Sequence, residues 1–110
     1  MGSNMVNNEK IAPDFGMELI KKLFSSELPK FKLIDSKNMG YYYYAQMYEY
    51  KNVTVLLGCE RGYLESMFKI NGEEMDLNLS ENQKILQPNE ANFRLIFNLI
   101  KKRIIENEMC

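Results

Sequence analysis

The sequence contains no histidine and no tryptophan among its 110 residues. Without histidine, neither a Ser-His-Asp nor a Cys-His relay can form, and imidazole-dependent zinc sites are excluded. The commonest general base near neutral pH is therefore missing as well. The glycines are scattered, so there is no Gly-rich phosphate loop, and no calcium-binding loop motif is present. We therefore predict no catalytic residue, no cofactor and no bound metal, and we expect the protein not to be an enzyme.

Cysteine is also scarce. Cys59 lies inside an apolar run and Cys110 is the last residue of the sequence, which is a poor pattern for a disulfide. We interpret Cys59 as a small buried apolar side chain and Cys110 as an exposed thiol, as expected in a reducing compartment. The first residues lack the pattern of a signal peptide, and no apolar run approaches the roughly 20 residues that span a membrane. We expect a cytoplasmic protein without a membrane partner.

Neither sign of charge is in excess. Lysine and arginine number 14 and aspartate and glutamate number 15, so the formal net charge is −1. This balance provides no general attraction to nucleic acid. The basic run Lys101–Arg103 is interpreted as a solvated helix end that complements the helix dipole, and we expect no nucleic-acid partner.

The composition that remains, 45% hydrophobic and 26% charged, is typical of one globular domain. We expect a flexible N-terminus over residues 1–12, of which residues 1–4 resemble a cloning scar, and a single α+β domain over residues 13–110. A helix is predicted from Asp14, as its N-cap, to Ser25. Another is predicted from Pro88 or Asn89 to Asn107. Their apolar faces carry Phe15, Leu19, Ile20, Leu23 and Phe24, and Phe93, Ile96, Phe97, Ile100 and Ile104.

Between the helices, the periodicity changes to that of strands. Turns are predicted at Ser36–Gly40, Glu49–Asn52 and Arg61-Gly62, and at Asn71-Gly72, the strongest short hairpin signal. The segments between them predict an antiparallel meander of about five strands, with residues 80–87 as a loop or a short helix. The strands are expected over residues 31–34, 41–48, 53–60, 63–70 and 73–79. Both helices should pack on one face of this sheet, which leaves the other face available.

Strand alternation sorts the side chains into an inward and an outward set. The nearly apolar set is predicted to face the helices: Val53, Val55, Leu57, Cys59, Leu64, Phe68, Ile70, Met75 and Leu77. In the tyrosine-rich strand we assign the less polar side, with Ala45 and Met47, inward. The predicted partner-binding residues on the outward face are Tyr42, Tyr44, Tyr48, Glu60, Tyr63, Glu65, Glu74 and Asp76. Ordinary sheet packing is the alternative explanation for the tyrosines, and a one-residue bulge would exchange the two tyrosine sets.

Paired carboxylates are the only acid–base candidates. Glu60 and Glu65 could face each other across the Arg61-Gly62 turn, and Glu73, Glu74 and Asp76 cluster on the last strand. A two-carboxylate mechanism needs a cleft that raises one of the two pKa values. Acids beside turns and on an outer sheet face are usually solvated, so we interpret these groups as binding residues and not as catalytic ones.

Three stretches together resemble a known family. They are the aromatic strand Tyr41-Tyr42-Tyr43-Tyr44-Ala45-Gln46-Met47-Tyr48, the strand-turn-strand Leu57-Gly58-Cys59-Glu60-Arg61-Gly62-Tyr63-Leu64-Glu65, and the hairpin Asn71-Gly72-Glu73-Glu74. With a helix on either side, this pattern is similar to the small bacterial immunity proteins of contact-dependent inhibition and polymorphic toxin systems. The resemblance implies a cytoplasmic protein that clamps a cognate toxin domain, often a nuclease with a basic active site. Acids at Glu60, Glu65, Glu74 and Asp76 would steer that encounter, with Tyr42, Tyr44, Tyr48 and Tyr63 as anchors.

Two other binding functions fit the same sequence. A chaperone for a secreted effector is also small and α+β, but it dimerises, whereas the sequence slightly favours a monomer. A phage-borne inhibitor protein is the other alternative. The neighbouring genes would discriminate among the three.

Overall fold

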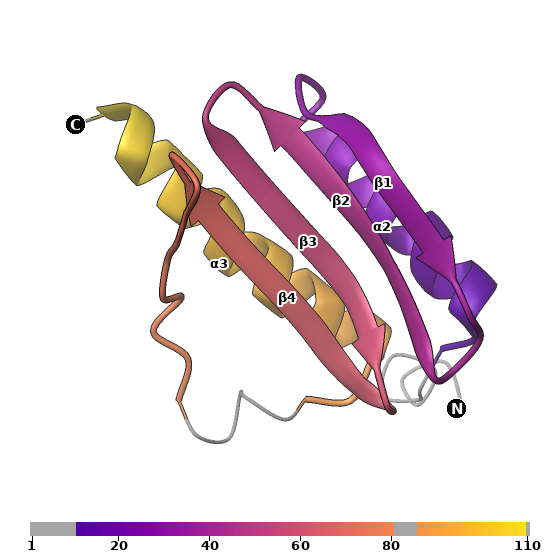
Figure 1. Cartoon of the computed structure of the whole chain (residues 1–110). Coiled ribbons are helices and arrows are strands. Elements are labelled where there is room, and N and C mark those ends of the chain that lie inside the picture. Colours follow the sequence, from indigo (N-terminus) through magenta and orange to yellow (C-terminus); the bar gives the residue numbers. More distant parts are fainter. Residues whose placement is uncertain (1–10, 81–85, 110) are drawn as a thin grey trace.

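The chain forms an α+β fold, as predicted, with two helices and a five-stranded antiparallel sheet in the described residues. Figure 1 shows both helices and strands β1 to β4. The computed structural model describes residues 11–80 and 86–109, so most of the expected flexible start lies outside these ranges. The elements in chain order are α2 (Pro13–Glu27), β1 (Lys32–Asn38), β2 (Tyr43–Tyr50), β3 (Val53–Glu60), β4 (Tyr63–Ile70), β5 (Glu73–Glu74) and α3 (Glu90–Met109).

Helix α2 begins one residue before its predicted start. Ala12 is the N-cap in an extended conformation and Pro13 occupies the first turn, where its fixed φ suits a helix. The predicted capping role of Asp14 is therefore wrong. Its carboxylate instead complements the positive end of the helix dipole and accepts a hydrogen bond of 2.9 Å from the Asn38 amide. Phe15 was expected on the apolar face, but 72% of its surface is exposed.

The sheet is a simple meander in which every strand pairs with its neighbour in sequence. Strands β3 and β4 have the predicted bounds. The reason is that the two-residue turns predicted at Arg61-Gly62 and Asn71-Gly72 form and flank β4. Arg61 and Gly62 have φ values of 53° and 86°, and Asn71 and Gly72 have 56° and 80°. Positive φ at both central residues is the type I′ geometry that matches the twist of a hairpin.

The outer strands differ from their predicted extents. Strand β1 continues through residues 36–38, which were predicted to turn, and an irregularity between Leu33 and Asp35 lets it follow β2. Strand β2 likewise includes residues 49–50 of a predicted turn, leaving Lys51 and Asn52 as the loop. At the other edge β5 ends at Glu74, whereas the sequence predicted a strand through residue 79.

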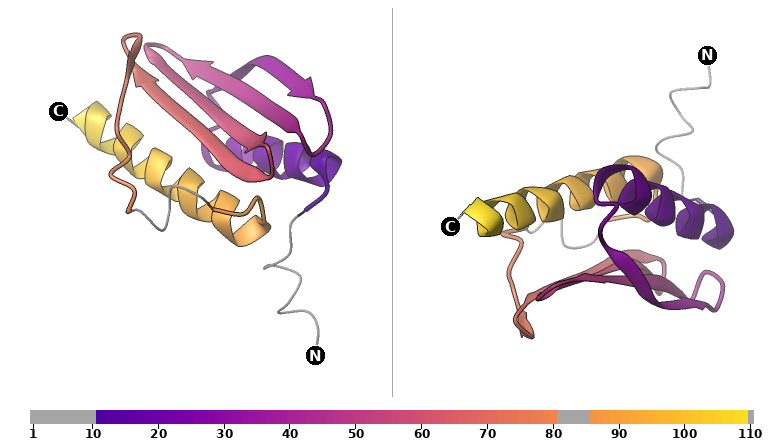
Figure 2. Two further views of the ribbon diagram at one scale, coloured as in Figure 1. Left: turned by 60° about the horizontal axis from the view of Figure 1, so that its bottom comes forward. Right: turned by 90° about the horizontal axis from the view of Figure 1, so that it is seen from above.

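Both helices pack on the same face of the sheet, so the molecule has two layers (Figure 2). Helix α2 contacts β2 and β3, and α3 contacts β4. The core lies between the layers, and the inward set predicted for β3 and β4 is confirmed: Val55, Leu57, Cys59 and Phe68 are at most 1% exposed. The predicted stripe of α3 is also buried, and it consists of Phe93, Ile96, Phe97, Ile100 and Ile104.

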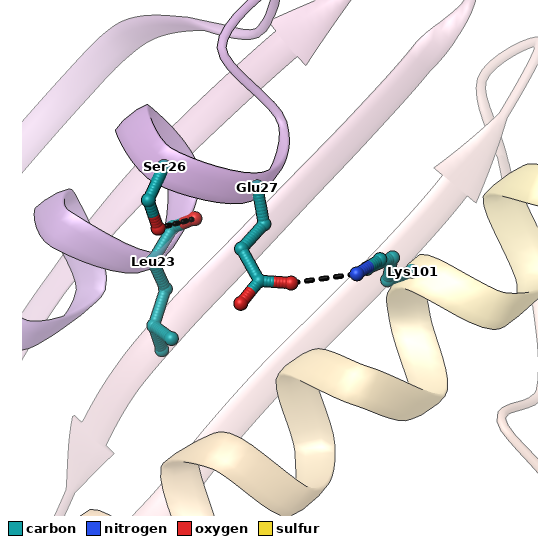
Figure 3. Close-up of polar contacts among 4 residues, drawn as sticks. All are labelled: Leu23, Ser26, Glu27 and Lys101. Carbon is teal, nitrogen blue, oxygen red and sulfur yellow. Dashed lines mark hydrogen bonds and ion pairs between the residues drawn. The ribbon is translucent and has the colours of Figure 1, made fainter.

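Polar contacts hold α3 at its start and along its second half. The Asn89 side chain caps the helix by accepting a hydrogen bond of 2.8 Å from the Asn92 backbone N–H. In the second half of the helix, the Lys101 ammonium pairs with the Glu27 carboxylate of α2 at 2.6 Å, which joins the two helices (Figure 3). Arg103 donates a hydrogen bond to the Asp76 backbone carbonyl. Two members of the predicted basic run therefore make tertiary contacts, and the helix continues beyond them to Met109.

One close packing contact involves the only tyrosine that is completely buried. Tyr44 is 0% exposed, and its hydroxyl has no hydrogen-bond partner within the described residues. A Cβ atom at Gly16 would lie 2.5 Å from this hydroxyl oxygen, so a glycine is needed where α2 crosses the ring. Burial raises the pKa of the Tyr44 hydroxyl well above its usual value of 10.0.

Candidate partner-binding face

Neither of the two described helices covers the second face of the sheet (Figure 2). Because β3 presents Val53, Val55, Leu57 and Cys59 inward, the alternate residues of each strand point away from the helices. Register extends this set across the sheet, and we call it the outer face. It comprises Lys32, Asp35 and Lys37 of β1, Tyr43, Ala45, Met47 and Glu49 of β2, Thr54, Leu56, Gly58 and Glu60 of β3, Tyr63, Glu65, Met67 and Lys69 of β4, and Glu74 of β5.

The predicted outward position of Tyr44 and Tyr48 is wrong. Tyr44 pairs with Cys59 and Tyr48 with Val55, so both lie on the helix-facing side, where they are 0% and 5% exposed. The Tyr48 ring stacks on Phe24 at a centroid distance of 3.9 Å, and its hydroxyl donates to the Gln46 side chain at 2.9 Å. The large ring area buried by each tyrosine outweighs the polarity of one hydroxyl. Ala45 and Met47, predicted inward, belong to the outer face.

Four of the predicted residues do lie on the outer face: Glu60, Tyr63, Glu65 and Glu74. Tyr63 is half exposed, and Glu60 and Glu65 are partly buried at the same end of the β3–β4 hairpin. Tyr42 is 61% exposed but lies in the turn before β2, where its carbonyl accepts a hydrogen bond from the Arg61 N–H at 2.7 Å. It therefore borders the outer face at the hairpin end without belonging to a strand.

Asp76 lies apart from the other predicted residues. It follows the end of β5, and its carboxylate accepts a hydrogen bond of 2.8 Å from the Asn78 backbone N–H. Its backbone carbonyl is held by Arg103 of α3. Asp76 thus contributes to a local turn and to the attachment of the helix, and the structure does not bring it together with Glu60 and Glu65.

Sequence reasoning missed Tyr43 and the apolar middle of the outer face. Tyr43 lies directly opposite Glu60, which in turn lies opposite Tyr63, so these three side chains form a row across β2, β3 and β4. A second row of Met47, Leu56 and Met67 crosses the same strands and is only partly buried. Strand pairing was the signal that could have found both rows, because directly paired residues share a face.

The acids of the outer face raise the pKa values of their neighbours. Burial is the main cause of the raised pKa of Glu65, followed by the charge of Glu60 and a side-chain hydrogen bond with it. Burial also raises the pKa of Tyr43, with the charges of Glu65 and Glu60 as smaller causes. The protonated carboxyl of Glu65 can donate a hydrogen bond to Glu60, whereas two carboxylates repel each other. This end of the face therefore disfavours a second negative charge.

No lysine or arginine in the described ranges is within ion-pair distance of Glu60 or Glu65. The ion pairs found there involve acids of the helices: Glu90 with Arg94, Glu27 with Lys101, and Glu106 with Arg103. The two carboxylates thus repel each other without an ion pair to compensate them, although Lys37 and Lys69 lie on the same face. Such uncompensated charge lowers stability and is typical of surfaces that are neutralised by a ligand.

Replacing Glu65 by glutamine should stabilise the protein near neutral pH. The pKa of Glu65 is higher in the folded protein than its value of 4.5 in the unfolded chain. Glu65 therefore adds to the free energy of unfolding below pH 4.5, and this contribution disappears as the pH rises through the folded-state pKa. The variant cannot ionise, so its midpoint of urea unfolding should exceed that of the wild type near pH 7. The difference should shrink as the pH falls below 4.5.

Glu60→Gln provides the reciprocal control, since it removes the neighbouring charge that raises the pKa of Glu65. It should give part of the same gain near neutral pH. The prediction is wrong if Glu65→Gln lowers the free energy of unfolding by the same amount near pH 7 and below pH 4.5. Glu65 would then make a favourable contact that does not depend on its charge.

A groove of about 750 Å³ lies away from the sheet, lined by residues of α2 and α3. Phe15 and Leu19 contribute apolar surface, and Glu90 and Arg94 form an ion pair of 2.9 Å at its rim. Glu18, Lys21, Lys22 and Ser25 also line the groove, so its wall mixes apolar residues with charges of both signs.

No family model, curated protein or solved structure matches this chain. Within residues 11–80 and 86–109, no group of three or more cysteine, aspartate or glutamate side chains is arranged to hold a metal ion. Neither of the helices described there combines the length and apolar character needed to cross a bilayer.

Proposed function

We propose that this protein is an immunity protein that neutralises a cognate bacterial toxin in the cytoplasm by forming a tight complex with it. One observation carries the proposal: the sheet has an uncovered outer face with tyrosines and an uncompensated carboxylate pair. A positively charged protein surface would relieve the repulsion between Glu60 and Glu65, and the apolar row beside them would supply contact area. The resemblance to immunity proteins supports this reading.

The remaining features of the face fit a protein partner better than a small molecule. An antiparallel sheet gives a broad surface without deep concavity, whereas small-molecule sites are concave. Tyr43 and Tyr63 stand at the end with the acids, and Met47, Leu56 and Met67 adjoin them. Tyrosine is enriched among the residues that dominate protein–protein binding energies. The face therefore has the aromatic anchors and apolar middle that such an interface needs.

The test is co-expression with the C-terminal domain of the toxin encoded directly upstream. The wild-type protein should restore growth and co-purify with that domain. Charge reversal in Glu65→Lys should weaken the complex by roughly 30-fold or more, as expected at a charged hot spot. Lys102→Glu, on the exposed side of α3, is the matched control and should leave binding unchanged.

Three results would contradict the proposal. One is the absence of a toxin gene upstream, and another is a toxin domain that still kills cells expressing the wild-type protein. The third is a tight homodimer by light scattering together with capture of a secreted effector, which would favour the chaperone function.

A further inference from the structure

The end of the outer face holds two acids between two aromatic rings. Tyr43, Glu60 and Tyr63 are direct cross-strand neighbours on adjacent strands. Directly opposed side chains have Cβ atoms about 5 Å apart, so Glu60 has a tyrosine on either side. Glu65 lies two residues beyond Tyr63 on the same face of β4, and it is close enough to hydrogen-bond Glu60.

Glycine at position 58 shapes this arrangement. Glu65 pairs with Gly58, which pairs with Ala45, which in turn pairs with Lys37 of β1, so the two inner positions of this row carry little or no side chain. Ala45 is only 4% exposed although the register places it on the outer face. An added Cβ at Gly58 would lie 2.0 Å from the Tyr44 carbonyl oxygen, so glycine lets β2 and β3 approach closely beside the two acids.

We infer that this site, bounded by Tyr43, Glu60, Tyr63 and Glu65, binds an arginine side chain that projects from the protein partner. The inference rests on the proposed function and specifies the partner's contact group. A guanidinium is planar and has five N–H donors, so it can donate to both carboxylates at once while its faces contact the tyrosine rings. A lysine ammonium is a compact point charge that lacks this planar fork.

Charge and contact area support the same assignment. Bringing one positive charge between Glu60 and Glu65 turns their mutual repulsion into two charge-assisted hydrogen bonds. The partly buried row of Met47, Leu56 and Met67 lies beyond the Ala45–Gly58 row, where it can pack against apolar residues around the arginine. Such surrounding contacts exclude water and strengthen a central charged anchor.

Titration of the isotopically labelled full chain with N-acetyl-arginine amide, followed by NMR, tests the inference without the partner. Saturating shifts should be confined to the amides around Tyr43, Glu60, Tyr63 and Glu65. N-acetyl-lysine amide should bind several-fold more weakly, and N-acetyl-citrulline amide, which has a similar shape but no charge, should not bind. Glu60→Gln and Tyr63→Leu should each weaken arginine binding by roughly threefold.

Glu49→Gln is the matched control, because it removes an exposed acid from the far end of the same face and should leave arginine binding unchanged. Equal binding of lysine and arginine, shifts centred elsewhere, or an equal effect of Glu49→Gln would overturn the inference. If Glu65→Lys still abolishes toxin binding while arginine does not bind, the arginine anchor is wrong and the immunity function stands. If arginine binds as expected and no toxin contacts the face, the immunity function is wrong.

Discussion

Gly58→Ala should lower the free energy of unfolding by about 3 kcal/mol, at the upper end for overpacking of a protein interior. An added Cβ would lie 2.0 Å from the Tyr44 carbonyl oxygen and 2.6 Å from the Ala45 Cα. Both atoms belong to the backbone of β2, which cannot rotate away as a side chain can. The alanine would therefore force β2 away from β3, the central strand of the sheet.

The matched control is Gly72→Ala in the β4–β5 turn. Gly72 has a φ of 80°, and a Cβ there would meet nothing within 4 Å. Gly72→Ala should lower the free energy of unfolding only by the strain of an alanine in the left-handed conformation, about 1 kcal/mol. Urea unfolding followed by circular dichroism measures both variants. If Gly58→Ala costs no more than Gly72→Ala, β2 and β3 do not approach each other as closely as described at this position.

Phe24→Ala should be at least as destabilising, by about 3–5 kcal/mol, the usual range for removing a buried phenylalanine. Phe24 is 1% exposed and lies at the meeting point of α2, α3 and the sheet. Its ring stacks on Tyr48 at 3.9 Å and meets the edge of Phe97 at 5.2 Å. Truncation leaves a cavity that no single neighbour can fill, because each of them is held by its own element.

Phe15→Ala makes the same chemical change on the same helix and is therefore the control. The Phe15 side chain is mostly exposed, so its loss should change the free energy of unfolding by less than about 0.5 kcal/mol. Thermal unfolding of the two variants compares them directly. Similar losses for both would mean that Phe24 is not the packing centre of the core.

The parts of the fold that sequence predicted best were bounded by turns with a local signature. Arg61-Gly62 and Asn71-Gly72 both adopt positive φ values, and β4 between them has its predicted ends. The ends of β1 and β5 had no such signature. Strand β5 stops at Glu74, and the following chain is held through Asp76 by Arg103, a residue 27 positions away. Local alternation carries no information about a contact of that range.

In strand β2, the assignment of the inward-facing side chains determined which tyrosines were predicted to bind a partner. Polarity alone placed Ala45 and Met47 inward, but pairing with β3 decides the face. Tyr50 pairs with Val53 across the Lys51-Asn52 turn, so Tyr48 meets Val55 and shares its buried face. The longer turn predicted over residues 49–52 would have placed Tyr48 opposite Val53, which is also buried. Any turn with an even number of residues gives this result.

The same reasoning explains which site residues could be predicted. The sequence suggested that Glu60 and Glu65 could face each other across the two-residue turn. The register instead pairs them with Tyr63 and Gly58, and they interact as diagonal neighbours on the same face. Tyr43 could be added only by carrying the register across one more strand. The absence of a compensating lysine or arginine depends on where the side chains of all the described elements point, which no local pattern encodes.

Strand order has a consequence for how the protein folds. Because the strands follow each other in both sequence and space, the meander can form from contacts between neighbouring segments, which is the arrangement that favours rapid folding. Helix α3 is different, since its Lys101 meets Glu27 across 74 residues. As the chain leaves the ribosome, α2 can cover β2 and β3 early, while the part of the sheet under α3 stays exposed to water. Synthesis of this helix closes the core, and only then is the nascent protein protected from aggregation through its inner face.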